Sequence, residues 1–147
     1  MKLKLVSVGK ARGGLYGVAI DEYAGRIRRF ADLSLHELRA DTKEREATAI
    51  LEAARGKERP EVWALDQRGR EVTSEELAQR LGRLRDSARD LSLCIGGDEG
   101  LSNSVIQAVS FTWSLSKLTL PHRLARVVVL EQLYRAFEIL RGGPYHK

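Results

Sequence analysis

Short apolar stretches alternate with helical stretches along the whole 147-residue chain, and this alternation constrains the fold more than any other feature. Residues 2–9, 33–40, 61–66 and 90–95 have the apolar content and alternation typical of strands. A further stretch, 111–120, predicts a fifth strand or an extended segment. Alternating strands and helices indicate an α/β fold, so we expect an α/β sandwich with a mostly parallel sheet.

Helical spacing or helix-boundary residues mark the segments between and after these strands. We expect helices at 15–30, 42–56, 73–88, 102–109 and 121–142. Thr42 and Ser74 are the predicted N-terminal caps, Gly56 and Gly142 the predicted stops, and Pro121 takes an early position in the last helix. Residues 67–72, QRGREV, have the composition of a turn. With no internal repeat and no linker, residues 1–147 are expected to form a single domain.

Composition narrows the class of protein. With 43% hydrophobic and 31% charged residues, the chain has the composition of a soluble globular protein. No apolar run is long enough to span a bilayer, and the first ten residues resemble a strand more than a signal peptide, so we expect a cytoplasmic protein without membrane contact. The single cysteine, Cys94, lies in an apolar strand and is expected to be a core residue, with no disulfide and no metal site.

The net charge of +5 is concentrated near the C-terminus. Residues 115–147 contain six basic and two acidic residues, which leaves the first 114 residues close to neutral. A basic excess confined to one region suggests a polyanionic partner such as RNA. A solvated helix face with scattered arginines explains the same charge equally well.

The stretch CIGGDEGLS at 94–102 places three glycines after the fourth predicted strand. It lacks the lysine and hydroxyl of a P-loop, and its GGxxG spacing differs from the GxGxxG of dinucleotide-binding folds. A tight turn with no ligand remains open. So does a site for S-adenosylmethionine, because Asp98 and Glu99 would tolerate a sulfonium cation and disfavour a phosphate. Both this loop and residues 64–66 occupy the carboxyl ends of predicted strands, where α/β folds bind ligands.

Several stretches carry a resemblance to a known family. Residues 95–102, IGGDEGLS, and 114–147, SLSKLTLPHRLARVVVLEQLYRAFEILRGGPYHK, closely resemble the ribosomal RNA large subunit methyltransferase H family, of the SPOUT class of knotted methyltransferases. The first ten residues and ALDQRG at 64–69 resemble the same family in the same order. The resemblance implies a homodimer with a C-terminal trefoil knot that methylates N3 of a pseudouridine in a 23S rRNA stem-loop at the subunit interface.

The resemblance also implies roles for particular residues. The S-adenosylmethionine pocket would be built from three segments, which here are Leu65; Gly96, Gly97 and Gly100; and Leu115, Ser116, Lys117, Leu118, Thr119 and Leu120. His122, Tyr145 and His146 are the catalytic candidates, with the C-terminal tail folded over the pocket across the dimer. Arg123, Arg126, Arg135 and Lys147 are the candidates for phosphate contacts in RNA.

Structural roles explain several of these residues as well. His122 could simply orient the start of the last helix, the tail could be a frayed end, and Arg126 and Arg135 could pair with Glu131 or Glu138. The apolar residues of the last helix cover more than one face, which fits either a dimer interface or a thick monomeric core. A non-catalytic RNA-binding or ribosome-associated factor of the same fold, and a nucleotide-binding regulator, are the competing functions.

Overall fold

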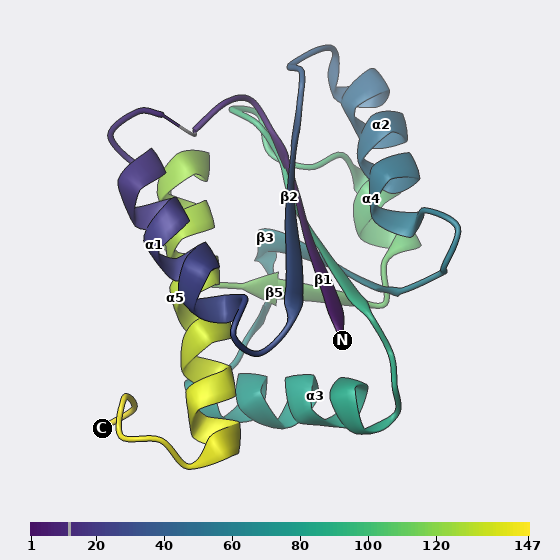
Figure 1. Ribbon diagram of the computed structural model, residues 1–147. Coiled ribbons are helices and arrows are strands. Elements are labelled where there is room, and N and C mark those ends of the chain that lie inside the picture. The colour runs from purple at the N-terminus through teal and green to yellow at the C-terminus, as the bar shows by residue number, and fades with distance from the viewer. Residues whose placement is uncertain (12) are drawn as a thin grey trace.

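The computed structural model describes residues 1–11 and 13–147 (Figure 1). The strands are β1 (Lys2–Val8), β2 (Asp32–Leu38), β3 (Glu61–Glu71), β4 (Leu91–Ile95) and β5 (Phe111–Ser114). The helices are α1 (Gly17–Ile27), α2 (Lys43–Arg55), α3 (Ser74–Asp86), α4 (Asn103–Ala108) and α5 (His122–Arg141). The order of elements agrees with the alternation predicted from the sequence.

The strands form one sheet in the order β2-β1-β4-β3-β5, and all four pairings are parallel. The expected α/β sandwich with a parallel sheet is therefore confirmed. Since every strand runs in the same direction, the carboxyl ends of all five meet at one edge of the sheet. Loops that follow different strands can come together there.

Helices cover both faces of the sheet. Helices α1, α3 and α5 lie together on one face, while α2 and α4 lie on the other (Figure 1). Each face buries its own apolar cluster, the larger one around Leu93, Trp63 and Leu133, and the smaller one around Val6 and Ile50. Cys94 is fully buried, as expected, and burial raises the pKa of its thiol to about 12.

Helix α5 is apolar on several faces because it is packed between neighbours of its own chain. It contacts both α1 and α3, and Leu130, Leu133 and Phe137 are buried in the core below the sheet. This packing agrees with the monomeric-core interpretation of its apolar faces. Gly142 ends the helix in the left-handed conformation, with φ +71°, as predicted.

Two local predictions were wrong. Residues 67–71 continue β3 instead of forming a turn, because the strand pairs with β5 a second time after an irregularity between Leu65 and Arg70. The N-cap of α3 is Thr73 and not Ser74: the Thr73 side chain accepts from the Glu76 backbone and the Glu76 side chain accepts from the Thr73 backbone, a complete capping box. The predicted caps of α2, Thr42 and Gly56, are confirmed.

Among the described residues, no helix combines the length and the apolar character that crossing a bilayer requires.

Candidate functional site

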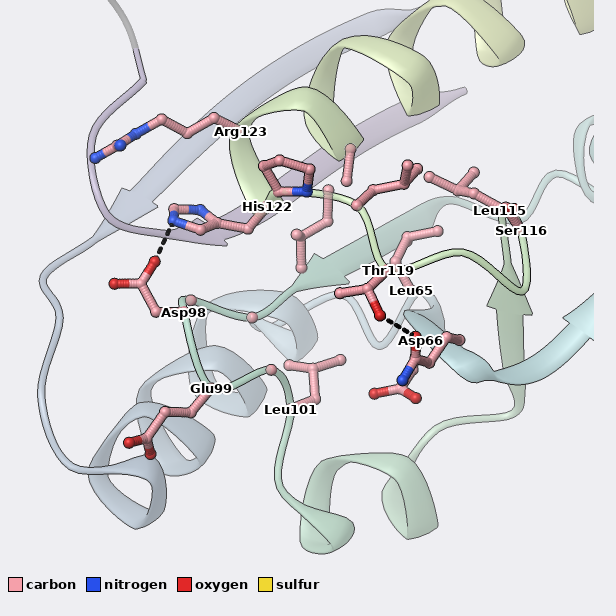
Figure 2. A pocket seen from close by; sticks show the side chains of 18 of the residues that line it. Leu65, Asp66, Asp98, Glu99, Leu101, Leu115, Ser116, Thr119, His122 and Arg123 are labelled. Carbon is pink, nitrogen blue, oxygen red and sulfur yellow. Dashed lines mark hydrogen bonds and ion pairs between the residues drawn. The ribbon is translucent and has the colours of Figure 1, made fainter.

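A cavity of about 800 Å³ lies at the carboxyl edge of the sheet, and three separate segments of the chain form most of its wall. The segments are residues 65–68 in β3, residues 95–101 after β4, and residues 115–123 between β5 and the start of α5, with the exception of Lys117. Figure 2 shows side chains from all three segments around the same space. The structure thus brings together stretches that are up to 58 positions apart in the sequence.

The glycines after β4 have a clear geometric reason. A Cβ on Gly96 would lie only 2.5 Å from the carbonyl carbon of Gly100, so no side chain fits there. Gly100 has a φ of +75°, and its backbone N–H donates a 3.0 Å hydrogen bond to the Gly97 carbonyl. The loop is a tight turn, and the same turn forms one wall of the cavity.

The extension of β3 supplies residues that the sequence analysis missed. Arg68 pairs with Asp66 at 2.8 Å and also donates to Asn103 Oδ1 and to the Leu101 carbonyl, which ties β3 to the loop after β4. Burial tends to raise the pKa of the Asp66 carboxyl, but hydrogen bonds and charge from Arg68 outweigh it, so this pKa lies below its ordinary value. The Gly69 position is closed to any side chain by the backbone of Thr112.

The third segment has little regular structure and is held by side-chain contacts. The Thr119 hydroxyl donates a 3.0 Å hydrogen bond to Gln67 Oε1 of the first segment (Figure 2). Of the positions expected to bind the cofactor in this segment, Leu115, Ser116, Leu118, Thr119 and Leu120 line the cavity, whereas Lys117 is exposed and is not part of the wall. Gln67 could have been found only by recognising that β3 runs past Leu65.

His122 and Asp98 close one side of the cavity. His122 Nε2 lies 3.0 Å from Asp98 Oδ1, and this contact joins the first residue of α5 to the glycine loop (Figure 2). The Asp98 side chain is 94% exposed, whereas that of His122 is only 16% exposed. The wall also contains three acidic side chains (Asp66, Asp98, Glu99) and three basic ones (Lys43, Arg68, Arg123).

Of the four predicted phosphate contacts, Arg126 is placed where it cannot serve. It is 2% exposed, and its guanidinium is hydrogen-bonded to Glu37 and to backbone carbonyls at the end of β1. The prediction that Arg126 contacts RNA is therefore wrong, because its guanidinium is buried and a phosphate cannot reach it. Burial lowers the pKa of Arg126, and the neighbouring Glu37 carboxylate opposes that shift.

The other three candidates for phosphate contacts lie in different surroundings. Arg123 is exposed at the cavity wall, where its Nε donates to the Lys10 carbonyl at 2.8 Å. Arg135 pairs with Glu131 at 2.6 Å, as the structural interpretation of the sequence predicted, and also contacts His146. Lys147 is exposed at the end of the chain.

The C-terminal tail folds back along α5 and contacts its middle turns, at Glu131, Tyr134 and Arg135, away from His122 at the start of the helix (Figure 1). The 20 residues of α5 span about 30 Å. His146 Nε2 lies 2.8 Å from Glu75 in α3, and the Tyr145 hydroxyl donates to Glu131 at 2.9 Å. Within one chain, therefore, Tyr145 and His146 do not reach the cavity that His122 lines.

The environment of Tyr145 keeps its phenol protonated. Its ring packs edge-on against Tyr134, with 4.7 Å between centroids, and the Arg135 guanidinium lies over its face. Burial, followed by the hydrogen bond to the Glu131 carboxylate, raises the pKa of Tyr145 well above its ordinary value. In this position Tyr145 is a hydrogen-bond donor and not a base.

The cavity has the features expected of a site for a small molecule of mixed polarity. Leu65, Ile95, Leu101, Trp113 and Leu115 supply an apolar wall, and the glycine loop exposes backbone groups without side chains. His122 places an imidazole, which can donate or accept hydrogen bonds, at its edge. Among residues 1–11 and 13–147, no group of three or more potential ligands could hold a metal ion.

Comparison with known proteins agrees with this geometry. A family model described as "Predicted SPOUT methyltransferase" matches residues 1–146. A protein of Anaeromyxobacter sp. (strain Fw109-5), named ribosomal RNA large subunit methyltransferase H, is 46% identical, with 100% of both chains covered. One of the same name from Coxiella burnetii (strain Dugway 5J108-111) is 41% identical, again over 100% of both.

A solved structure supports the fold. The SpoU methyltransferase AviRb from Streptomyces viridochromogenes, in complex with the cofactor AdoMet, superimposes with a TM-score of 0.53 over 95% of this chain and 58% of its own, at 15% identity. At that identity the likeness concerns the fold. The family model and the full-length relatives go further, and the chain belongs to the ribosomal RNA large subunit methyltransferase H family of SPOUT methyltransferases.

Proposed function

We propose that this protein transfers a methyl group from S-adenosylmethionine to N3 of a pseudouridine in a 23S rRNA stem-loop at the subunit interface. Full-length relatives carry the name of a large-subunit rRNA methyltransferase. The observation that carries the proposal is the convergence of residues 65–68, 95–101 and 115–123 on one cavity. These segments include nine of the ten positions expected to bind the cofactor; Lys117 is the exception.

The cavity suits this cofactor in size and charge. Its volume of about 800 Å³ lies in the range of cofactor sites. Asp98 and Glu99 of the glycine loop place two carboxylates in the wall, which would tolerate a sulfonium cation and repel a phosphate chain. S-adenosylmethionine would supply an electrophilic methyl group. The residues around the cavity would hold the cofactor so that the attacking nitrogen of the RNA base approaches this methyl group in line with the bond that breaks.

The nucleophile requires help from the protein, because N3 of a pseudouridine carries a proton at neutral pH. A base or a charge near that atom must assist its removal. His122 is the candidate at the cavity within one chain, and Tyr145 and His146 are the candidates from the tail. Because Tyr145 donates to Glu131, its proposed role is to donate a hydrogen bond to the target nucleotide, while an imidazole handles the proton.

A second copy of the chain would complete the site. Leu15, Val18 and Leu118 are large apolar side chains that remain 88%, 79% and 73% exposed. Leu118 lies in the cavity wall, and Leu15 and Val18 flank Tyr16, another wall residue. We propose that these side chains are covered in a homodimer whose symmetry brings the tail of one chain to the cavity of the other. We also propose that this chain forms the C-terminal trefoil knot of the family.

Contacts with RNA would come mainly from exposed cations near the cavity. Arg123 is the strongest candidate, since it is both exposed and part of the wall. Arg135 and Lys147 accompany the tail and would reach RNA together with it. Structured RNA is recognised largely through its shape and its backbone charge, which fits a few well-placed cations. We propose the assembled ribosome, in the cytoplasm, as the substrate.

Two measurements test the function. In calorimetry, S-adenosylmethionine should bind and ATP should not; the reverse would favour a nucleotide-binding regulator. Assembled ribosomes and free 23S rRNA from a strain lacking the enzyme should then be incubated with protein and cofactor, and digested for mass spectrometry. A methyl group on one pseudouridine is expected. Binding to RNA without any methyl transfer would instead indicate a non-catalytic RNA-binding factor.

A further inference from the structure

Arg126 is a buried cation whose hydrogen bonds join the start of α5 to the end of β1 and to β2. Its Nη1 donates a 2.8 Å hydrogen bond to Glu37 Oε2 at the end of β2, and its Nη2 donates to the carbonyls of Val8 and Gly9 after β1. Glu37 Oε2 also accepts from the Ala11 backbone N–H at 2.7 Å. The guanidinium is therefore fixed on several sides and has little freedom to rotate.

The same guanidinium meets His122, one helical turn earlier in α5. Arg126 Nη2 lies 3.4 Å from His122 Nδ1. Nη2 has two hydrogens, which it shares among the carbonyls of Val8 and Gly9 and Nδ1 of His122. Since a guanidinium can only donate, Nδ1 is the acceptor in any hydrogen bond that this contact makes. A neutral imidazole with an accepting Nδ1 carries its proton on Nε2. The contact thus selects one of the two tautomers of His122.

The other ring nitrogen has a partner that needs this tautomer. His122 Nε2 lies 3.0 Å from Asp98 Oδ1, and a carboxylate accepts a hydrogen bond. The Asp98 side chain is otherwise almost fully exposed, so the imidazole is what holds it at the cavity edge. A continuous series of contacts runs from Glu37 through Arg126 and His122 to Asp98, from the inside of the protein to the glycine loop.

We propose that Arg126 is a positioning residue that fixes the Nε2–H tautomer and the orientation of His122, and that through His122 it holds Asp98 at the cavity. This role explains why a cation is buried at this point. It also determines what His122 offers to a bound molecule: an N–H on the nitrogen that faces the cavity edge, which becomes free to donate to that molecule when Asp98 is displaced. His122 is then a donor in the resting protein.

The tautomer can be measured directly in the full-length protein labelled with ¹⁵N. Long-range ¹H–¹⁵N correlation spectra identify which ring nitrogen carries the proton, at a pH above the range where imidazoles titrate. We expect His122 to show the Nε2–H tautomer alone in the wild type. His36, exposed on β2, provides an internal reference for an imidazole without an arginine partner. A proton on Nδ1 of His122 would overturn the proposal.

Two variants separate the effect of Arg126 from that of Asp98. In Asp98→Ala, an exposed substitution that leaves the core intact, His122 should keep a single tautomer because Arg126 still donates to Nδ1. In Asp98→Ala/Arg126→Gln, it should become a mixture resembling His36. A mixture in the single variant, or a single tautomer in a folded double variant, would contradict the proposal. If the double variant does not fold, the single variant alone decides between these results.

Arg123→Gln, which removes the neighbouring exposed arginine, is the matched control and should leave the His122 tautomer unchanged. These spectra require neither cofactor nor RNA. A failure here would therefore leave the proposed methyl transfer untouched, and a failure of methyl transfer would leave the tautomer measurement valid.

Discussion

The hydroxyl of Tyr145 donates a 2.9 Å hydrogen bond to Glu131, which lies in the middle of α5. His122, another candidate for catalysis, is the first residue of the same helix. The Tyr145 contact therefore lies about 13 Å along the helix axis from His122.

Deletion of Tyr145–Lys147 should abolish methyl transfer, with a fall of at least about a hundredfold, if the tail supplies groups that act on the target nucleotide as proposed. Binding of S-adenosylmethionine, measured by calorimetry, should remain detectable, since the tail is not part of the cavity in its own chain. Full activity in the truncated protein would refute a catalytic role for the tail.

Mixing two inactive variants should restore activity if the site is shared between copies. In an equal mixture of His122→Ala and the tail deletion, half of the dimers would contain one of each chain. Each such dimer would have one intact site, so about a quarter of the wild-type activity is expected after subunit exchange. A mixture that stays inactive, although sedimentation shows exchange, would show that each chain works alone.

Gly96→Ala should destabilise the protein and remove cofactor binding together. The new Cβ would lie 2.5 Å from the Gly100 carbonyl carbon, and the loop has to open to accommodate it. We expect a loss of about 2 kcal/mol in the free energy of unfolding, measured with urea. Gly25→Ala is the matched control: in the exposed position of α1 its Cβ meets nothing within 4 Å, and a gain of about 0.5–1 kcal/mol is expected.

The free energy of unfolding should fall at acidic pH, and part of that loss should depend on Glu138. Hydrogen bonds from Arg141 and then from Tyr134 hold the pKa of Glu138 below its ordinary value of 4.5. A carboxyl with a lowered pKa in the folded state stabilises the protein above its unfolded pKa, and that contribution is lost as the pH falls through the folded value.

Glu138→Gln should thus lower the thermal midpoint at pH 7 and flatten the loss of stability below pH 4.5 relative to the wild type. Thermal unfolding followed by circular dichroism between pH 3 and pH 7 measures both (the range is chosen around the carboxyl pKa values). Parallel curves for the two proteins would show that Glu138 is not the group responsible.

Arg123→Gln should weaken RNA binding and reduce the slope of log affinity against log salt by about one, as expected for one lost phosphate contact. Arg55→Gln, an exposed substitution at the end of α2, is the control and should leave the slope unchanged. Equal slopes for Arg123→Gln and the wild type would remove Arg123 from the interface. Fluorescence anisotropy with an rRNA stem-loop is sufficient for the comparison.

Much of the fold could be predicted because the local signals agree with the final packing. Helix α2 begins after Thr42 and ends at Gly56, and both residue types are typical of helix ends. The apolar stretches that contain Leu93 and Trp63 form strands in the core of the sheet. The extension of β3 could not be predicted, because QRGRE has the composition of a turn and is held in a strand by pairing with β5, 40 positions later. Pairing at long range overrode local preference there.

The candidate site, too, could be predicted only in part. The convergence of the three segments follows from the parallel sheet, whose carboxyl ends coincide. The family resemblance pointed to Leu65, the glycine loop and residues 115–120, whereas Gln67 and Arg68 were missed. The environment of Arg126 could not be predicted: an arginine in a basic helix is most often exposed, and only the fold places Glu37 and the Gly9 carbonyl beside it.

The position of the tail along α5 has a consequence for how the enzyme would be controlled. Helix α5 holds Tyr145 and His146 beside its later turns and away from the cavity of their own chain. If the tail acts across a homodimer, as proposed, an isolated chain would be inert whatever its affinity for cofactor. Dilution alone would then inactivate the enzyme, because dimers dissociate. Its specific activity would rise with protein concentration until all chains are dimeric. The abundance of the protein in the cell would itself act as the switch.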